Sequence, residues 1–332
     1  MAASFASGAL AQAASAPAPP ATPAAGTAAQ ARAFDLQGHR GARGLAPENT
    51  LAGFERAIAI GVTTLELDIG VTADGVPVVH HDLALNASLT RDASGRWLTG
   101  TGPTIRSLTL QQLQAYDVGR IDPASRHARL FPGQQPRDGE RIPTLAAVFR
   151  RADERGARQV RFSIETKLDP RRPGDTVDPE AFVDALLHVV REAGVSRRVS
   201  VQSFDWRTLL RVQQLEPAIP TVYLTTRSDS FDNLRDGAWT AGLRLADYGS
   251  VPALVEAAGG KVWSPRYDDL DAPGVREAQA RGLRVVPWTV NDPVDMVRLL
   301  DWGVDGLITD YPDRLRALLR ERDMPVPRVL HD

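Results

Sequence analysis

The 332-residue sequence contains no cysteine, and this absence excludes disulfides, thiolate metal ligands and cysteine nucleophiles. It also contains no run of about 18 apolar residues, so it predicts no transmembrane segment. Neither sign of charge dominates, because 39 Lys and Arg residues face 41 Asp and Glu residues and leave a net charge of −2. No overall positive field would attract nucleic acid or anionic lipid, so we expect no nucleic-acid partner and only local recognition of phosphate.

Residues 1–33 are rich in Ala, Pro, Ser and Thr, and Arg32 is their first charged side chain. This composition predicts a signal-like or disordered segment that stays outside the folded domain. Its small, weakly apolar start and its Ala-x-Ala patterns favour export. We therefore expect a periplasmic or secreted protein whose mature chain begins near residues 16–33. The alternative is a cytoplasmic enzyme with a disordered tail.

Residues 34–332 are long enough for one α/β barrel, and the sequence is 43% hydrophobic, which allows a substantial core. Short apolar runs alternate there with amphipathic helical patterns such as residues 49–60 and 144–155. The runs predict eight strands, at residues 34–38, 63–71, 161–166, 199–203, 221–225, 261–264, 284–289 and 305–309. Eight strand-then-helix units predict a parallel barrel whose chemistry lies where the strands end.

One stretch, residues 83–142, breaks this alternation with many turn formers and no long apolar run. Because a structureless loop of that length is uncommon, we expect an insertion over the barrel mouth that forms a small subdomain and contributes substrate contacts. Just before it, Asp74 and Gly75 predict a tight turn. That turn would fold residues 76–81 back along the second strand and bring His81 toward the carboxylates on that strand.

Acidic residues lie at the ends of two strands that we expect to be neighbours. Glu66 and Asp68 are two residues apart on one strand, so their side chains share a face. Two carboxylates alone would favour an ion pair with a nearby Arg or Lys. Glu165 ends the next barrel strand and adds a third hard oxygen ligand. The three residues together predict a site for Ca²⁺ or Mg²⁺.

Cationic and histidine side chains follow the same strands. Lys167 shares a face with Glu165, where it would neutralise a phosphoryl oxygen, pair with Glu165, or do both. Arg40 follows the first strand, and its guanidinium would bind two phosphate oxygens or face solvent. His39 and His81 come from different strand ends. Since imidazole titrates near neutrality, the two predict an acid/base pair.

Several of these positions keep two interpretations. Strand alternation puts His80 and His81 on opposite faces, and periodicity alone does not choose between them. Gln202 would hydrogen-bond substrate hydroxyls or be a buried core residue. Trp288 would form a wall of the pocket or pack in the core.

Two further polar pairs predict helix caps. Asn49 or Thr50 would accept hydrogen bonds from the free N–H groups that begin the first helix. Thr309 and Asp310 end the eighth strand, where the expected role is to cap the final helix.

The motifs together resemble the glycerophosphodiester phosphodiesterase family over roughly residues 36 to 320. An ordered series of this kind is far more specific than any single motif. The motifs are His39-Arg40-Gly41, Pro47-Glu48-Asn49-Thr50, Glu66-Leu67-Asp68, Asp74-Gly75, His81-Asp82, Ile164-Glu165-Thr166-Lys167, Gln202-Ser203-Phe204, Trp288-Thr289-Val290-Asn291 and Thr309-Asp310. The resemblance implies a TIM barrel with an insertion after the second strand.

The resemblance also implies a role for each site residue. In it, Glu66, Asp68 and Glu165 would hold the divalent cation, His39 and His81 would be the acid/base pair, and Arg40 and Lys167 would bind phosphate. His81 is favoured over His80 because Asp82 follows it, as in the family's His-Asp motif. The implied substrate is a small glycerophosphodiester such as glycerophosphocholine, which is split into glycerol 3-phosphate and an alcohol.

Two other functions compete with this one. A barrel phospholipase, phospholipase D-like or phosphoinositide-cleaving, would need an exposed apolar or aromatic rim to dock on a membrane. Aromatic residues make up only 6% of the sequence, which favours a soluble diester as substrate. A protein that captures glycerophosphodiesters without cleaving them would need no acid/base pair, so the presence of both His39 and His81 favours an enzyme.

Overall fold

The structure is a computed structural model and describes residues 1–4 and 34–327. All but the first four residues of the predicted signal-like segment lie outside the described residues. Export, and a mature start near residues 16–33, therefore stay predictions. Within the described part of the chain, no helix is both long enough and apolar enough to cross a membrane.

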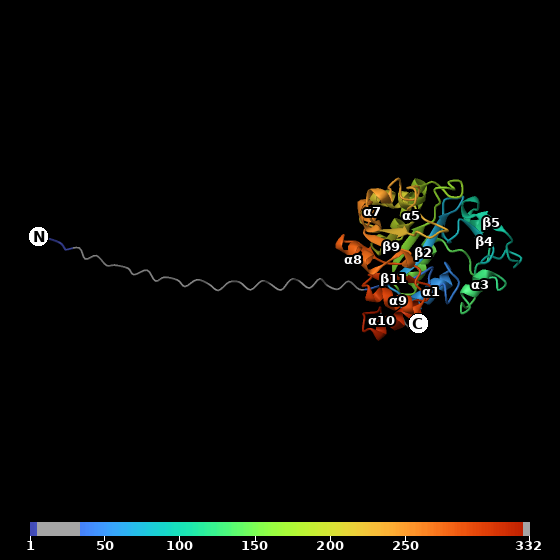
Figure 1. Cartoon of the computed structure of the whole chain (residues 1–332). Helices are drawn as coiled ribbons and strands as arrows, with labels where there is room; N and C mark the ends of the chain where they lie inside the picture. The colour runs from blue at the N-terminus through green and yellow to red at the C-terminus, as the bar shows by residue number, and fades with distance from the viewer. Residues whose placement is uncertain (5–33, 328–332) are drawn as a thin grey trace. The chain divides into compact units, whose positions relative to one another are not determined.

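Eight parallel strands form a barrel at the centre of the fold (Figure 1). In the order in which they pair, they are β10 (Arg284–Val285), β9 (Val262–Pro265), β8 (Thr221–Thr225), β7 (Val199–Ser203), β6 (Arg161–Thr166), β2 (Thr64–Val71), β1 (Asp35–Gly38) and β11 (Gly306–Thr309). Backbone hydrogen bonds from Asp305 to Val285 (2.9 Å) and from Ile308 to Pro287 (3.0 Å) join β11 to the β10 segment. The predicted TIM barrel is confirmed.

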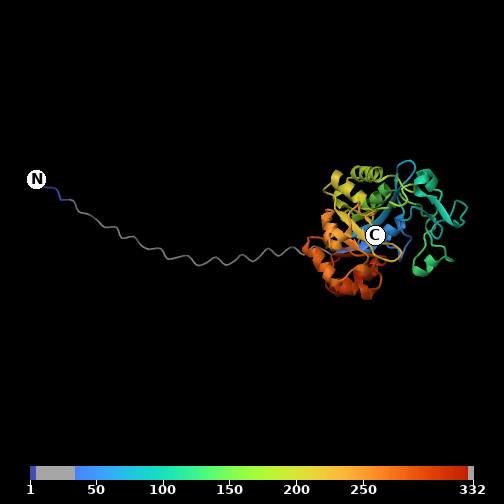
Figure 2. The same ribbon diagram turned by 45° about the horizontal axis from the view of Figure 1, so that its top comes forward.

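Helices surround the strands, as the two views in Figures 1 and 2 show. They are α1 (Leu51–Ile60), α4 (Leu145–Glu154), α5 (Pro179–Glu192), α6 (Trp206–Leu215), α7 (Val251–Ala257), α8 (Ala272–Ala280), α9 (Pro293–Asp301) and α10 (Pro312–Glu321). Short 3₁₀ helices are η2 (Ser196–Arg198), η3 (Leu245–Asp247) and η4 (Tyr267–Asp269). Apolar residues recur every three or four positions, so each helix buries one face, as Leu145, Val148, Phe149 and Ala152 do in α4.

The strand after β2 folds back as the sequence predicts. Gly75 adopts φ +79°, and β3 (Pro77–Val79) then pairs antiparallel with the end of β2, with Val79 opposite Ile69. The backbone N–H of His80 donates to Asp68 O at 3.0 Å and continues this pairing. The chain therefore arrives at residue 81 beside the carboxyl end of β2.

Residues 83–142 build a small layer of their own over one side of the barrel, where Figure 1 shows β4, β5 and α3 together. Its elements are β4 (Ala84–Asn86), β5 (Thr101–Thr104), η1 (Ile105–Ser107), α2 (Leu110–Leu113) and α3 (Arg126–Leu130). A separate apolar cluster packs beneath them and consists of Val78, Leu85, Ile105, Leu113 and Ile142. The insertion thus has its own core, which explains how a segment so rich in turns stays ordered.

The turn after β1 needs glycine at one position. Gly41 has φ +90°, which side chains other than glycine rarely adopt. A Cβ atom there would lie 2.7 Å from the carbonyl carbon of Gly53 in α1. The turn therefore lets α1 pack directly on the loop that carries His39 and Arg40.

We predict that Gly41→Ala destabilises the protein more than Gly75→Ala does. Both substitutions place a side chain at positive φ, which costs about 1–2 kcal/mol. The new Cβ at Gly75 meets nothing within 4 Å, whereas the one at Gly41 meets backbone and should cost about 1–3 kcal/mol more. Free energies of unfolding from urea titration check the difference. Equal losses for the two variants would contradict close packing at Gly41.

Candidate active site

The side chains that the sequence singles out gather at the carboxyl ends of the barrel strands. His39 and Arg40 follow β1, Glu66 and Asp68 lie on β2, His81 follows β3, Glu165 and Lys167 lie at the end of β6, Gln202 lies on β7, and Trp288 follows β10. All of them except Asp68 line one cavity of about 220 Å³. The structure therefore brings the predicted residues together, with Asp68 directly beneath the cavity wall, 3.6 Å from Lys167 Nζ.

Three carboxylates form a compact cluster at the edge of this cavity. Asp68 and Glu165 are paired across β2 and β6, and Glu66 lies two residues earlier on β2, facing the same way. A carboxylate oxygen from each lies within 4.8 Å of those of the others, and all three residues are buried. Oδ1 of Asp68 is buried without a hydrogen-bond partner. Buried oxygens at this spacing fit a divalent cation, so the cluster can hold one.

Neutral groups fix the orientation of two of these carboxylates. Glu66 accepts hydrogen bonds from Gln202 Nε2 at 2.7 Å and from the backbone N–H of Arg40 at 2.8 Å. Asp68 accepts one from Asn49 Nδ2 at 2.9 Å. Gln202 is buried and lines the cavity, with its amide nitrogen bound to Glu66, so hydrogen bonding of Gln202 to substrate stays a prediction.

Two cations lie beside the cluster. Lys167 Nζ is 2.7 Å from Glu165 Oε1 and 3.6 Å from Asp68 Oδ1. Arg40 Nε is 3.3 Å from Asp68 Oδ2, while its Nη1 donates to Glu48 Oε1 at 2.7 Å. The Arg40 guanidinium is thus held at the cavity by Glu48 and Asp68, and the residue is largely buried.

Burial acts to raise the pKa of all three carboxylates, and the charges around each one decide whether its pKa ends above or below the usual range. Burial, together with the charges of its neighbours, raises the pKa of Glu66 well above its usual range. Burial and the nearby Asp68 raise the pKa of Glu165 to about 7, even though Lys167 opposes the shift. Burial would also raise the pKa of Asp68, but the surrounding cationic side chains lower it. Without a cation, the cluster therefore retains protons near neutral pH.

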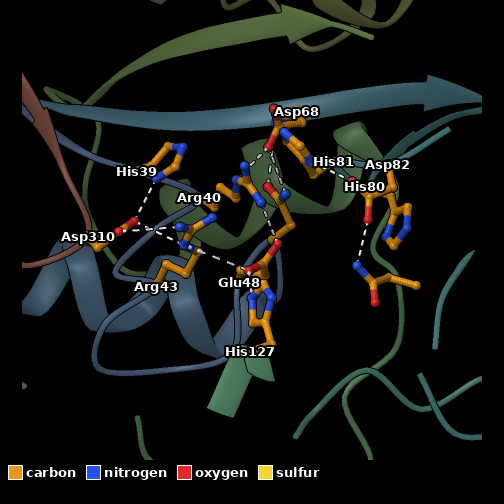
Figure 3. A network of polar contacts seen from close by, with 12 residues as sticks. His39, Arg40, Arg43, Glu48, Asp68, His80, His81, Asp82, His127 and Asp310 are labelled. Atoms are coloured by element: carbon orange, nitrogen blue, oxygen red, sulfur yellow. Dashed lines mark hydrogen bonds and ion pairs between the residues drawn. The ribbon is translucent and has the colours of Figure 1, made fainter. Parts of the chain in front are cut away.

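Each candidate catalytic histidine has its own carboxylate (Figure 3). His39 Nδ1 lies 2.6 Å from Asp310 Oδ1, and His81 Nδ1 lies 2.7 Å from Asp82 Oδ1. Because ionised carboxylates only accept hydrogen bonds, Nδ1 carries the proton in both rings and Nε2 is left as the acceptor. Burial lowers the pKa of His39. Burial, followed by the positive charges of Arg40 and Lys167, lowers the pKa of His81 to about 4.

The structure separates the two adjacent histidines. His81 lines the cavity, whereas His80 lies 3.4 Å from Ala84 O and lines a small hollow beneath the insertion with Leu89 and Val118. Figure 3 shows the two rings on different sides of the strand end. The alternation that periodicity left open thus places His81, and not His80, at the site.

The predicted capping role of Asp310 is wrong. Residue Tyr311 occupies the N-cap position of α10, and no side chain caps that helix. Asp310 points instead to His39, while Arg43 Nε contacts its Oδ1 at 3.1 Å and Asn291 Nδ2 donates to its Oδ2 at 2.7 Å. Burial acts to raise the pKa of Asp310, but these contacts lower it to about 2. Its position at a strand end within a motif was the one signal for this role.

At the first helix the cap is Thr50, whose side chain accepts the N–H of Gly53 at 3.0 Å, while Asn49 is used at the carboxylate cluster. Trp288 is half-buried, and its Nε1 donates to Ser264 O at 3.0 Å. Its ring forms part of the cavity wall, which agrees with the predicted wall position.

Glu48 connects the site to the insertion, a link that sequence reasoning missed. It binds Arg40, and it lies 3.5 Å from Nε2 of His127 in α3 (Figure 3). The ring of Phe131, just after α3, covers the Arg43 guanidinium at 4.5 Å from ring centre to Cζ. The insertion therefore packs on the side chains that hold Arg40 and Asp310.

Sequence comparison finds relatives over nearly the whole folded region. The sequence profile of the Glycerophosphoryl diester phosphodiesterase family matches residues 39–314. A glycerophosphodiester phosphodiesterase of Bacillus subtilis (strain 168) is 30% identical over 278 residues, which cover 83% of each chain. One from Caldanaerobacter subterraneus subsp. tengcongensis is 29% identical over 283 residues, 85% of this chain and 96% of the other.

Solved structures agree with the fold. A Silicibacter pomeroyi protein assigned to the same family is 36% identical, with a TM-score of 0.79 over 88% of this chain and 95% of the other. A phosphodiesterase of Oleispira antarctica, solved with its product sn-glycerol 3-phosphate, is 23% identical, with a TM-score of 0.64 over 86% of this chain and 96% of the other. That second likeness shows the shared barrel.

We predict that a divalent cation binds less tightly as the pH falls from 8 to 6. Since the pKa of Glu165 is raised to about 7, a proton competes with the cation below that pH, and affinity should drop by about tenfold per pH unit. Calorimetry in buffers of different ionisation enthalpy should show that binding releases protons. Glu165→Gln should bind more weakly and with less pH dependence. An affinity that stays constant over this range would contradict the proposed ligand set.

Proposed function

The chain belongs to the glycerophosphoryl diester phosphodiesterase family, and from this premise we propose that it hydrolyses glycerophosphodiesters to glycerol 3-phosphate and an alcohol. One observation carries the proposal. A single cavity is lined by two members of a three-carboxylate cluster, by two cationic side chains and by two histidines that are each bound to a carboxylate. A phosphodiester is anionic and repels nucleophiles, so its hydrolysis needs both positive charge and proton transfer. The cavity offers both.

We propose that Glu66, Asp68 and Glu165 hold the cation. Bound there, a divalent cation would supply positive charge to the phosphoryl oxygens and stabilise the charge that develops on them. Oxygen-only ligands suit Ca²⁺ or Mg²⁺. Arg40 and Lys167 lie next to the cluster and contact its carboxylates. On substrate binding, these two side chains would exchange those contacts for the remaining phosphate oxygens.

The two histidines occupy different positions relative to the substrate. His39 lines the catalytic cavity, whereas His81 also lines the open cleft beside it. We therefore assign His39 as the base that accepts a proton from the attacking oxygen, and His81 as the acid that protonates the departing alcohol. An anionic substrate would offset the charges of Arg40 and Lys167, which now keep the pKa of His81 low, and would raise it toward the range of a general acid.

The competing functions receive less support. Among residues 34–327, the exposed large hydrophobic side chains are Leu130 and Val294, and neither lines the catalytic cavity or the cleft beside it. A membrane-docking phospholipase would need such a rim. A non-catalytic binding protein would not need two histidines that line the cavity and are each bound to a carboxylate.

We predict that the purified protein releases glycerol 3-phosphate from glycerophosphocholine when Ca²⁺ or Mg²⁺ is present. Chelation should abolish turnover and added cation should restore it, because three buried carboxylates cannot act together as bare anions. An enzyme-coupled assay of glycerol 3-phosphate measures the reaction. Full turnover after EDTA treatment, with metal content verified as absent, would rule out the cation site.

We predict that His39→Ala and His81→Ala each lower turnover by roughly 10²–10⁴-fold, because each removes one proton-transfer group. His80→Ala is the matched control, and its turnover should stay close to that of the unmodified protein. Metal binding and thermal stability should change little in all three variants. A damaging His80→Ala with a nearly silent His81→Ala would overturn the assignment.

The leaving group separates the two histidines further. A nitrophenyl diester releases nitrophenolate, a weakly basic leaving group that needs little protonation. This substrate should therefore partly rescue the variant that lacks the acid. We expect rescue for His81→Ala and none for His39→Ala. The opposite pattern would exchange their roles, and equal loss on both substrates would remove support for any division of labour.

A further inference from the structure

A second hollow of about 930 Å³ opens directly beside the catalytic cavity. The two share His81, Glu165, Lys167, Phe204 and Trp288 in their walls. A group attached to a phosphate in the catalytic cavity would therefore extend past His81 into this cleft. The cleft is large for an ordinary small alcohol, and its lining indicates which chemistry it favours.

Aromatic rings from three different loops form one wall of the cleft. The ring of Phe204 meets Trp288 with 5.4 Å between centres and meets Phe231 with 5.2 Å, both edge to face. Trp239 is buried and supports Phe231 from behind, with centres 4.9 Å apart. Phe204, Phe231 and Trp288 stay partly accessible. Aromatic faces attract organic cations, and quaternary ammonium groups above all.

Acidic side chains predominate on the rest of the rim. Asp82, Asp169 and Asp175 line the cleft together with Arg172. Arg172 contacts both Asp169 (3.0 Å) and Asp175 (3.3 Å), so one guanidinium is shared by two of the three aspartates, while Asp82 contacts His81 and Asn86. Burial would raise the pKa of Asp82, but hydrogen bonds from His81 and Asn86 lower it, which keeps it ionised. The excess of negative charge favours a cationic ligand.

The positive charge at the other end limits where such a ligand can lie. Lys167 Nζ is 6.0 Å from the centre of the Phe204 ring, at the catalytic end of the cleft. It attracts the phosphate and repels a second cation. A cationic group would therefore be most stable farther along the aromatic wall, at Phe231, where repulsion by Lys167 is weaker.

We propose that this cleft binds the alcohol half of the substrate and selects alcohols that carry a quaternary ammonium group, with Phe231 as the specificity-determining residue. The inference rests on the proposed hydrolysis of glycerophosphodiesters and adds to it a preference among them. The phosphate lies beside Lys167 and the cation site, and the ammonium lies against the aromatic wall near the acidic rim.

Two substrates of the same shape test the preference. One is glycerophosphocholine, and the other is the glycerol phosphodiester of 3,3-dimethylbutanol, in which carbon replaces the charged nitrogen. We expect kcat/KM to favour the choline diester by roughly tenfold, mainly through KM, because a partly desolvated cation gains that much from aromatic faces. Phe231→Leu keeps an apolar side chain but removes the π face. It should reduce the ratio to near one, mainly by raising KM for the choline diester.

Matched controls keep the result interpretable. Trp302→Leu removes an aromatic ring that stacks on Arg298 at the outer surface, 5.3 Å away, and should leave the ratio unchanged. If Phe231→Leu does not fold, Asp169→Asn combined with Asp175→Asn tests the acidic rim and should also lower the ratio. Equal turnover of both diesters by the unmodified protein, or an unchanged ratio in the folded cleft variants, would overturn the inference alone. Turnover of neither diester would overturn the proposed function and the inference with it.

Discussion

The rest of the site depends on the mutual repulsion of three buried carboxylates on neighbouring strands. The pairing of β2 with β6 brings carboxylate oxygens of Glu66, Asp68 and Glu165 within 4.8 Å of one another at buried positions. In that environment like charges are expensive, and only a positive partner makes the arrangement stable. Lys167 and Arg40 supply part of that charge in the protein itself. The raised pKa values of two carboxylates show that this compensation is incomplete, which is the physical basis for a cation at the cluster.

The same constraint accounts for the otherwise unusual local structure around the cluster. Arg40 adopts φ +50°, an uncommon conformation for a residue with a side chain, and this conformation goes with a backbone N–H directed at Glu66. Asn49 likewise has φ +54° and donates its side-chain amide to Asp68. Such strain persists when the surrounding packing fixes it, and Gly41 permits that packing by letting α1 approach. The loop conformation, the packing of α1 and the orientation of the carboxylates therefore depend on one another.

The sequence predicted the repeating strands and helices of the barrel, but it did not predict contacts between side chains that lie far apart in the sequence. The barrel strands were predictable because buried parallel strands are continuous apolar runs, and the predicted strand at 284–289 is shorter in the structure, where Pro287 has no N–H to extend the ladder. Asp82 was visible because it adjoins His81. Asp310 contacts His39 as Asp82 contacts His81, but it lies 271 residues away in the sequence. Nothing in the sequence around Asp310 points to His39, so the commoner role of a helix cap was the natural prediction.

The insertion supports the side chains of the site as well as covering one side of the barrel. Its His127 and Phe131 pack on Glu48 and Arg43, which in turn hold Arg40 and Asp310 in place. Its first residues, 83–88, line the cleft beside the catalytic cavity. A barrel without this segment would keep the three carboxylates, since those lie on strands, but it would lose the support of Arg40 and one wall of the cleft. The strands therefore determine where the negative charge lies, and the insertion determines how Arg40 is held and what shape the cleft beside it has.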